Sequence, residues 1–298
     1  MAISIRSDSA LPFSSRYRLK GGVPLLWVPT MIDFALARRM MVDGQVRTSD
    51  VTDLRIIAAM LELPRERFVS VADTDLAYLD TDVPAIQGAG GEQVRHLLKP
   101  MVLAKLVQAA AVKPDDRVLD VGCATGYSAA LLARLARSVV ALEQDPVLVR
   151  LARDNLQAVG AGNATVVTGP LTEGWQPDAP YDVVFVNGAT ENMPRTLCRQ
   201  LKDGGRLVAV VGGAPMGRAM LYCSVHGDVS GRPIFDAAAP LLPGFAAPPA
   251  VVFAMDHSAS LSIALVWRES TKGRVLAKVS FSPRSRRAAS PILVNIGG

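Results

Sequence analysis

The chain has few of the residues that build disulfide frameworks and metal clusters. It contains three cysteines and three histidines in 298 residues. They are scattered along the chain, as Cys123, Cys198, Cys223, His96, His226 and His257. No Cys-x-x-Cys spacing is present, so a zinc module and a disulfide-stapled fold are both excluded. Isolated thiols in odd number are typical of a reducing compartment, and we expect a cytoplasmic protein.

Long apolar runs are also missing. No stretch reaches the roughly eighteen apolar residues that a membrane span needs. The short apolar segment 23–29 contains Pro24 and is at the lower limit of a signal-peptide core. Half of the residues are nevertheless hydrophobic, which is ordinary for a globular enzyme and too many for a disordered chain. We therefore expect a globular protein with no membrane partner.

An excess of one charge is absent from the middle of the chain. The formal net charge of +5 arises from residues 1–30 and 251–298, whereas residues 31–250 hold slightly more acids than bases. No aromatic residues are interleaved with the arginines of 284–287, as a nucleic-acid footprint would require. The basic ends are therefore interpreted as solvated, and no nucleic-acid partner is expected.

Hydrophobic periodicity divides the chain into four parts. Residues 1–30 show no sustained period and are expected to be a loosely ordered extension. Residues 31–112 are mainly helical, with patterns near 31–41, 51–61 and 92–111 and with Pro100 near a helix start. Residues 113–250 alternate strands and helices, and 251–298 form a basic, flexible tail. A monomer is expected.

The alternating part predicts a doubly wound, mostly parallel α/β sheet preceded by the helical extension. The predicted strands are 117–121, 138–142, 164–167, 182–186 and 206–211. Further strands, as an antiparallel edge, are expected in 219–239. The predicted helices are 127–135, 146–159 and 193–201. Continuous apolar strands separated by helices are typical of a parallel sheet covered on both faces. Such sheets bind ligands at the carboxyl ends of their strands.

The first of these strands runs into a glycine turn, Val118-Leu-Asp-Val-Gly-Cys-Ala-Thr-Gly-Tyr-Ser128. Gly122 and Gly126 let a bulky cofactor pass close to the backbone. Asp120, at the strand end, is placed to hold a cationic or hydroxyl group. Glu143 ends the next strand and is predicted to accept hydrogen bonds from both hydroxyls of a ribose.

Such a turn can bind a dinucleotide or a sulfonium cofactor, or it can be a generic tight turn without a ligand. The segment 122–126 does not fit the Gly-x-Gly-x-x-Gly pattern of dinucleotide folds. An acid before the first glycine suits a zwitterionic sulfonium with a free amino group and suits a pyrophosphate poorly. Asp120 and Glu143 in this context therefore predict S-adenosylmethionine.

The stretch 31–213 resembles the protein-L-isoaspartate O-methyltransferase family, most strongly over 113–213. The motif 113–130 is similar to the family's first motif, including the aromatic Tyr127 after the last glycine. Residues 163–169, Gly174-Trp175, 179–189 and 201–208 resemble its later strands, and 66–69 with 77–78 fit its helical part. The resemblance implies methylation of an isoaspartyl carboxylate in a damaged protein or peptide, with S-adenosylmethionine as the donor.

The resemblance also implies a set of cofactor-binding residues. These are Asp120, Gly122, Cys123, Ala124, Gly126, Tyr127, Glu143, Gln144, Gly169, Pro170, Leu171 and Asn187. Ala124 stands where the family has a central glycine, and Pro170 where it usually has an acid near the adenine. For Cys123, packing beside the cofactor is favoured over nucleophilic chemistry.

The acceptor segment departs most from the family pattern. The family's Thr-Ile-Ser corresponds to His96-Leu97-Leu98, so His96 and Leu98 occupy the positions of hydroxyl residues in the methyl-transfer site. Transfer to a carboxylate needs no general base, but the carboxylate needs donors, for which Arg95, His96 and the amides of 187–189 are candidates. An exposed loop histidine is the alternative for His96.

Two other functions remain open on the sequence alone. One is a methyltransferase with a different acceptor, and the other is a cofactor-binding relative without catalysis, which Leu98 would favour. Methylation of a flipped base is disfavoured, because Asn187-Gly-Ala189 replaces the Asn/Asp-Pro-Pro-aromatic platform.

Overall fold

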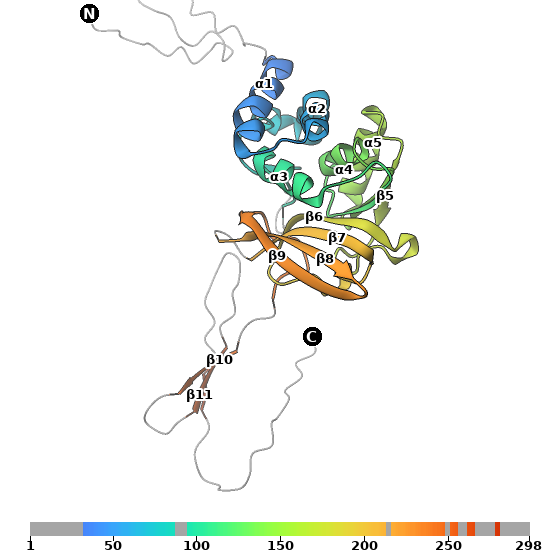
Figure 1. Ribbon diagram of the computed structural model, residues 1–298. Coiled ribbons are helices and arrows are strands. Elements are labelled where there is room, and N and C mark those ends of the chain that lie inside the picture. Colours follow the sequence, from blue (N-terminus) through green and yellow to red (C-terminus); the bar gives the residue numbers. More distant parts are fainter. Residues whose placement is uncertain are drawn as a thin grey trace, which may run out of the picture. The chain divides into compact units, whose positions relative to one another are not determined.

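The computed structural model describes residues 32–86, 94–212 and 216–247, and the backbone of three strands beyond them (Figure 1). Residues 1–30, expected to be loosely ordered, lie outside the described residues, as does most of the expected tail at 251–298. The chain forms two compact units, 1–245 and 246–298. Among the described residues no helix is long and apolar enough to cross a membrane.

A seven-stranded sheet forms the centre of the first unit, in the order β5-β4-β3-β6-β7-β8-β9. Its strands are β3 (Arg117–Val121), β4 (Ser138–Glu143), β5 (Ala164–Thr168), β6 (Tyr181–Thr190), β7 (Leu201–Val211), β8 (Arg218–Val225) and β9 (Asp228–Asp236). β5 to β7 across the sheet are parallel, and β8 and β9 add an antiparallel edge. This confirms the doubly wound, mostly parallel sheet. The order reverses beside β3, where such sheets bind ligands.

Apolar residues cover both faces of the sheet, as the continuous apolar strands require. On one face Val118, Val183 and Phe185 join a core with α3 (Pro100–Ala110), α4 (Tyr127–Ala133) and α5 (Pro146–Ala158). On the other, Leu119 and Val184 pack in a second core that includes α6 (Arg195–Cys198). The helices are therefore divided unequally between the faces.

The helical part precedes the sheet and packs over α3, as Figure 1 shows for α1 and α2. It contains α1 (Phe34–Met41), a π-helical turn (Val42–Val46), α2 (Leu54–Glu62) and three 3-10 segments, Arg47–Ser49, Arg65–Phe68 and Val71–Leu76. A further 3-10 segment, Gln176–Asp178, follows β5 within the sheet part of the fold. Asp33 and Asp53 cap α1 and α2, because their carboxylates accept hydrogen bonds from first-turn amides.

The helix expected over 92–111 begins only at Pro100. The residues before it form β2 (His96–Leu97), which pairs with β1 (Val83–Pro84) in an antiparallel two-stranded ribbon. Proline at the first helical position lacks an amide that would in any case have no intrahelical partner, so it starts the helix there. The acceptor segment is therefore extended.

The second unit contains three short antiparallel strands, β10 (Val251–Met255), β11 (Leu261–Leu265) and β12 (Lys278–Ser280), in the order β10-β11-β12. The apolar residues of 261–265 thus form a strand in a region where the sequence patterns predicted none.

Candidate cofactor and acceptor site

Asp120 lies at the carboxyl end of β3 and is fully buried. Its Oδ2 accepts a hydrogen bond from Ser128 Oγ at 2.6 Å, whereas Oδ1 is buried without a partner. Burial, opposed by the Ser128 hydrogen bond, raises the pKa of Asp120 to about 7. A buried carboxylate oxygen without a partner is costly, so this oxygen is available to a donor from a ligand. The arrangement fits an ammonium or hydroxyl group.

Glu143 lies at the end of β4, next to β3, and is also fully buried. Its Oε1 accepts hydrogen bonds from the amides of Gln144 at 2.9 Å and Asp145 at 3.4 Å, and its Oε2 from the amide of Ala124 at 2.9 Å. The carboxylate therefore links the two strand ends. It borders a pocket of about 440 Å³, a volume within the range of small-molecule sites.

The glycine turn connects β3 to α4 through three left-handed residues. Gly122, Ala124 and Gly126 have φ angles of 78°, 51° and 98°. A Cβ at Gly122 would lie 2.4 Å from the guanidinium of Arg95, so glycine allows a bulky group to approach there. Gly126 differs from the expectation, because it faces Ala152 and Leu156 of α5 and permits helix packing.

Arg95 reaches into this pocket from the start of the acceptor segment. Its Nε and Nη2 both lie 3.4 Å from Glu143 Oε2, and Nη2 donates a hydrogen bond to the Gly122 carbonyl at 2.7 Å. The Asn187 amide, from β6, donates to the same carbonyl at 3.0 Å. The structure thus places Arg95 beside the predicted ribose-binding carboxylate, a contact that the sequence analysis did not anticipate.

The segment 240–245 forms another wall that the sequence analysis missed. Ala189, near the end of β6, donates to the Pro240 carbonyl at 2.8 Å and accepts from the Leu242 amide at 2.9 Å. Pro243 and Gly244 consequently line the pocket with Glu143. The only signal in the sequence was the apolar pair 241–242 between two prolines.

The remaining predicted cofactor residues lie in three settings. Gln144 lines the pocket, and Gly169, Pro170 and Leu171 follow β5, which pairs with β4 at Glu143. Cys123 is buried, and burial raises the pKa of its thiol well above its usual range, which excludes an activated nucleophile. Leu171 is buried and Pro170 exposed.

Leu98 and Tyr127 line a narrow gap next to Cys123, Ser128 and Asn187. Arg65, fully buried, donates to the Leu98 carbonyl at 2.9 Å, and its guanidinium lies 4.9 Å from the centre of the Tyr127 ring. This contact fixes the backbone at the position where the family has a hydroxyl residue. The site there presents an apolar side chain.

His96 is half-buried in β2 and has a buried Nδ1 without a partner. Burial lowers its pKa below the ordinary value, against the opposing effect of Asp82. The imidazole is therefore neutral near pH 7 and lacks the charge of a strong carboxylate donor. His96 lines neither the pocket of Glu143 nor the gap of Leu98.

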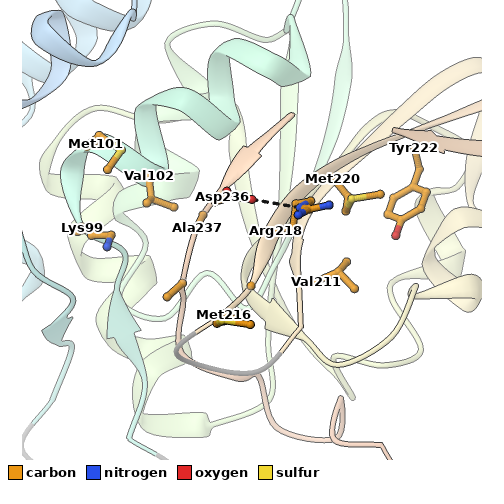
Figure 2. A pocket seen from close by; sticks show the side chains of 12 residues that line it. Lys99, Met101, Val102, Val211, Met216, Arg218, Met220, Tyr222, Asp236 and Ala237 are labelled. Atoms are coloured by element: carbon orange, nitrogen blue, oxygen red, sulfur yellow. Dashed lines mark hydrogen bonds and ion pairs between the residues drawn. The ribbon is translucent and has the colours of Figure 1, made fainter. Parts of the chain in front are cut away.

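An open pocket of about 720 Å³ lies where α3 meets the antiparallel edge (Figure 2). Lys99 follows the acceptor segment and borders it, and its walls carry Met101, Met216 and Met220. Arg218 and Asp236 form an exposed ion pair of 3.1 Å at its rim.

Among the described residues no group of acids, histidines and cysteines is suited to hold a metal ion.

Comparisons with known proteins agree with this geometry. The family model for protein-L-isoaspartate(D-aspartate) O-methyltransferase matches residues 38–227. A protein-L-isoaspartate O-methyltransferase of Koribacter versatilis is 39% identical over 184 residues, 62% of this chain and 80% of that protein. One of Methanoregula boonei is 41% identical over 179 residues, which cover 60% and 80%.

Solved structures support the same fold. A protein-L-isoaspartate O-methyltransferase superimposes with a TM-score of 0.62 and 19% identity, over 83% of this chain and 88% of that one. A putative family member from Plasmodium falciparum, in complex with S-adenosyl-L-homocysteine, gives a TM-score of 0.57 and 17% identity, over 69% and 97%.

Proposed function

We propose a cofactor site and an acceptor for this chain, which belongs to the protein-L-isoaspartate(D-aspartate) O-methyltransferase family of S-adenosylmethionine-dependent enzymes. The cofactor is held between Asp120 and Glu143. The acceptor is an isoaspartyl carboxylate, which is methylated beside Leu98. The observation that carries the cofactor site is the pair of buried carboxylates at adjacent strand ends. One of them, Asp120, has an oxygen without a partner.

Each polar group of the pocket has a role in this proposal. Asp120 Oδ1 would accept a hydrogen bond from the amino group of the cofactor, and Glu143 from its ribose hydroxyls. Gln144 and the residues 169–171 would border the adenine, and Asn187 and Cys123 the methionine part. The bound cofactor supplies a methyl group on a cationic sulfur.

The protein contributes alignment and the exclusion of water. The oxygen of a carboxylate acceptor is already negatively charged and attacks the methyl group directly, so no side chain has to remove a proton. Holding donor and acceptor in line is worth about 7–11 kcal/mol in favourable cases. Arg65 supports this alignment, because it contacts both the Leu98 carbonyl and the ring of Tyr127, two residues that line the narrow gap.

The open pocket of Figure 2 is proposed to receive the polypeptide around the acceptor residue. It begins at Lys99, directly after the acceptor segment. Its three methionines are flexible and polarizable, which suits peptides of varied sequence. Lys99 supplies a positive charge next to the acceptor position.

The cellular setting belongs to the same proposal. The cysteines in the described part of the chain are free, and two of them are buried, in keeping with a reducing compartment. We infer a cytoplasmic monomer that acts on proteins and not on nucleic acid, because the basic residues gather at the ends of the chain.

The test is methyl transfer from labelled S-adenosylmethionine to an isoaspartyl peptide, with the matching aspartyl peptide as the control. Labelling of the isoaspartyl peptide alone is the expected result. Because Leu98 replaces a hydroxyl residue, a different acceptor is the second candidate. It is favoured if the protein binds the cofactor with neither peptide labelled.

A further inference from the structure

The Arg95–Glu143 ion pair lies inside the proposed cofactor pocket and is almost fully buried. Arg95 is 7% exposed and Glu143 is not exposed at all. A carboxylate has about four lone-pair positions for hydrogen bonds. The amides of Gln144 and Asp145 use Oε1, and the amide of Ala124 and the Arg95 guanidinium use Oε2.

Three of these four donors are backbone amides of the strand ends and are fixed by the fold. Only the guanidinium is carried on a flexible side chain. Ribose hydroxyls can therefore reach Glu143 only where Arg95 now lies. We infer that Arg95 is a built-in competitor for the cofactor, whose displacement from Glu143 sets the cofactor affinity; this inference rests on the proposed cofactor site.

A second contact links the guanidinium to the backbone beside the narrow gap. The Gly122 carbonyl accepts hydrogen bonds from Arg95 Nη2 and from Nδ2 of Asn187, and Asn187 lines that gap. The guanidinium is therefore held by the Glu143 carboxylate and by the Gly122 carbonyl, and both contacts break when it leaves the pocket.

The movement is a side-chain rotation and not a shift of the acceptor segment. Arg65 holds the Leu98 carbonyl, and Asp82 accepts a hydrogen bond from the Lys99 amide at 2.8 Å. The paired backbone of β1 and β2 anchors the segment further. The competing group can therefore leave while the acceptor site keeps its form.

Arg95→Gln tests this competition, because glutamine removes the charge and ends at the level of the arginine Nε, so that the Nη2 donor to Gly122 and Glu143 is lost. If Arg95 leaves the site free in only a fraction of the molecules, the apparent Kd equals the intrinsic Kd divided by that fraction. We expect S-adenosylhomocysteine, titrated by calorimetry, to bind the variant at least about tenfold more tightly. An equal or weaker affinity would overturn the inference.

Arg206→Gln is the matched control, because Arg206 forms another largely buried pair, with Asp116 at 2.5 Å. This pair lies near the amino end of β3, away from the proposed cofactor site at its carboxyl end. This variant should lose stability and keep its affinity. Without ligand, the melting temperature of Arg95→Gln should be lower than that of the wild type. Saturating S-adenosylhomocysteine should abolish or reverse this difference in melting temperature, because the variant binds it more tightly. The lower melting temperature of Arg206→Gln should remain.

The outcomes separate this inference from the proposed function. Binding by Arg95→Gln with none by the wild type supports the competition. Binding by both proteins with equal Kd overturns the competition and leaves the cofactor site standing. If neither protein binds S-adenosylhomocysteine, the cofactor site and the competition both fail.

Discussion

The cofactor side and the acceptor side of the site are built from different structural elements. Asp120 and Glu143 lie at the carboxyl ends of adjacent parallel strands in the middle of the sheet, where register and burial fix their positions. His96 and Leu98 lie in and beside a two-residue strand held by distant contacts from Arg65 and Asp82. The sheet centre holds the cofactor residues by register and burial, while the acceptor residues lie in and beside a separate two-stranded ribbon. This difference fits the larger departure from the family pattern on the acceptor side, beside the smaller departures at Ala124 and Pro170 on the cofactor side.

The largest effect is expected from Glu143→Gln on the cofactor side. The change replaces a charged acceptor, and hydrogen bonds to charged groups are worth about 1.5–3 kcal/mol each. We expect the Kd for S-adenosylhomocysteine to rise by about tenfold to a hundredfold in calorimetry. Glu62→Gln, in an exposed pair with Arg134, is the control and should change nothing. Unchanged affinity in folded Glu143→Gln would remove the basis for the ribose assignment.

The next effect is expected from Leu98→Ser on the acceptor side. Leu98 is 2% exposed and offers no donor to a carboxylate. A hydroxyl there would restore a hydrogen bond worth about 1–3 kcal/mol, or about one to two decades in rate. We expect faster methylation of an isoaspartyl peptide with an unchanged Kd for S-adenosylhomocysteine.

Leu106→Ser provides the control for that change, because Leu106 is equally buried in α3 and lies outside both cavities. It should destabilise the protein without raising the rate. If Leu98→Ser leaves the isoaspartyl rate at the wild-type value, the acceptor is bound elsewhere or is of another kind.

A smaller effect is expected in the pH dependence of cofactor binding, which tests the role of Asp120 separately from that of Glu143. Burial raises the pKa of Asp120 to about 7, against the opposing influence of Ser128 and Arg95, while Glu143 raises it further. A cationic amino group binds the ionised form, so below pH 7 binding must release the proton. The affinity for S-adenosylhomocysteine should rise with pH from 5.5 to 7, by up to about tenfold per unit, and then level off.

Asp120→Asn should abolish this pH dependence and bind more weakly at pH 7.5. Calorimetry across the pH range measures both effects. A wild-type affinity that falls or stays constant between pH 5.5 and 7 would show that Asp120 does not hold the amino group.

Local patterns predicted the elements whose contacts are local. The predicted strand 117–121 matches β3, and the helix at 146–159 differs from α5 by one residue. Strand 182–186 was predicted too short, because β6 continues to Thr190 with backbone partners from the distant segment 240–245. The helix at 193–201 was too long, since Leu201 already pairs with Tyr181 in the sheet.

The candidate site shows the same limit. Asp120 and Glu143 were found because a strand end and a glycine turn are visible in the sequence. The position of Arg95 against Glu143, the wall at 240–245 and the anchoring by Arg65 are long-range contacts. No periodicity or motif in a single sequence records them, because they depend on how the segments pack.

The smallest effect concerns backbone strain in the glycine turn, on the side where the family pattern is best kept. Ala124 has a φ of 51°, a left-handed conformation that costs an L-residue about 1–2 kcal/mol. Its amide donates to Glu143, so the fold holds it there. Ala124→Gly relieves the strain but adds freedom to the unfolded chain, which is worth about 0.4–1 kcal/mol. The free energy of unfolding in urea should therefore rise by about 1 kcal/mol or less. Ala129→Gly, inside α4, should lower it by about 0.5–1 kcal/mol. A loss of stability in Ala124→Gly as large as in Ala129→Gly would show that the left-handed conformation at residue 124 carries no strain.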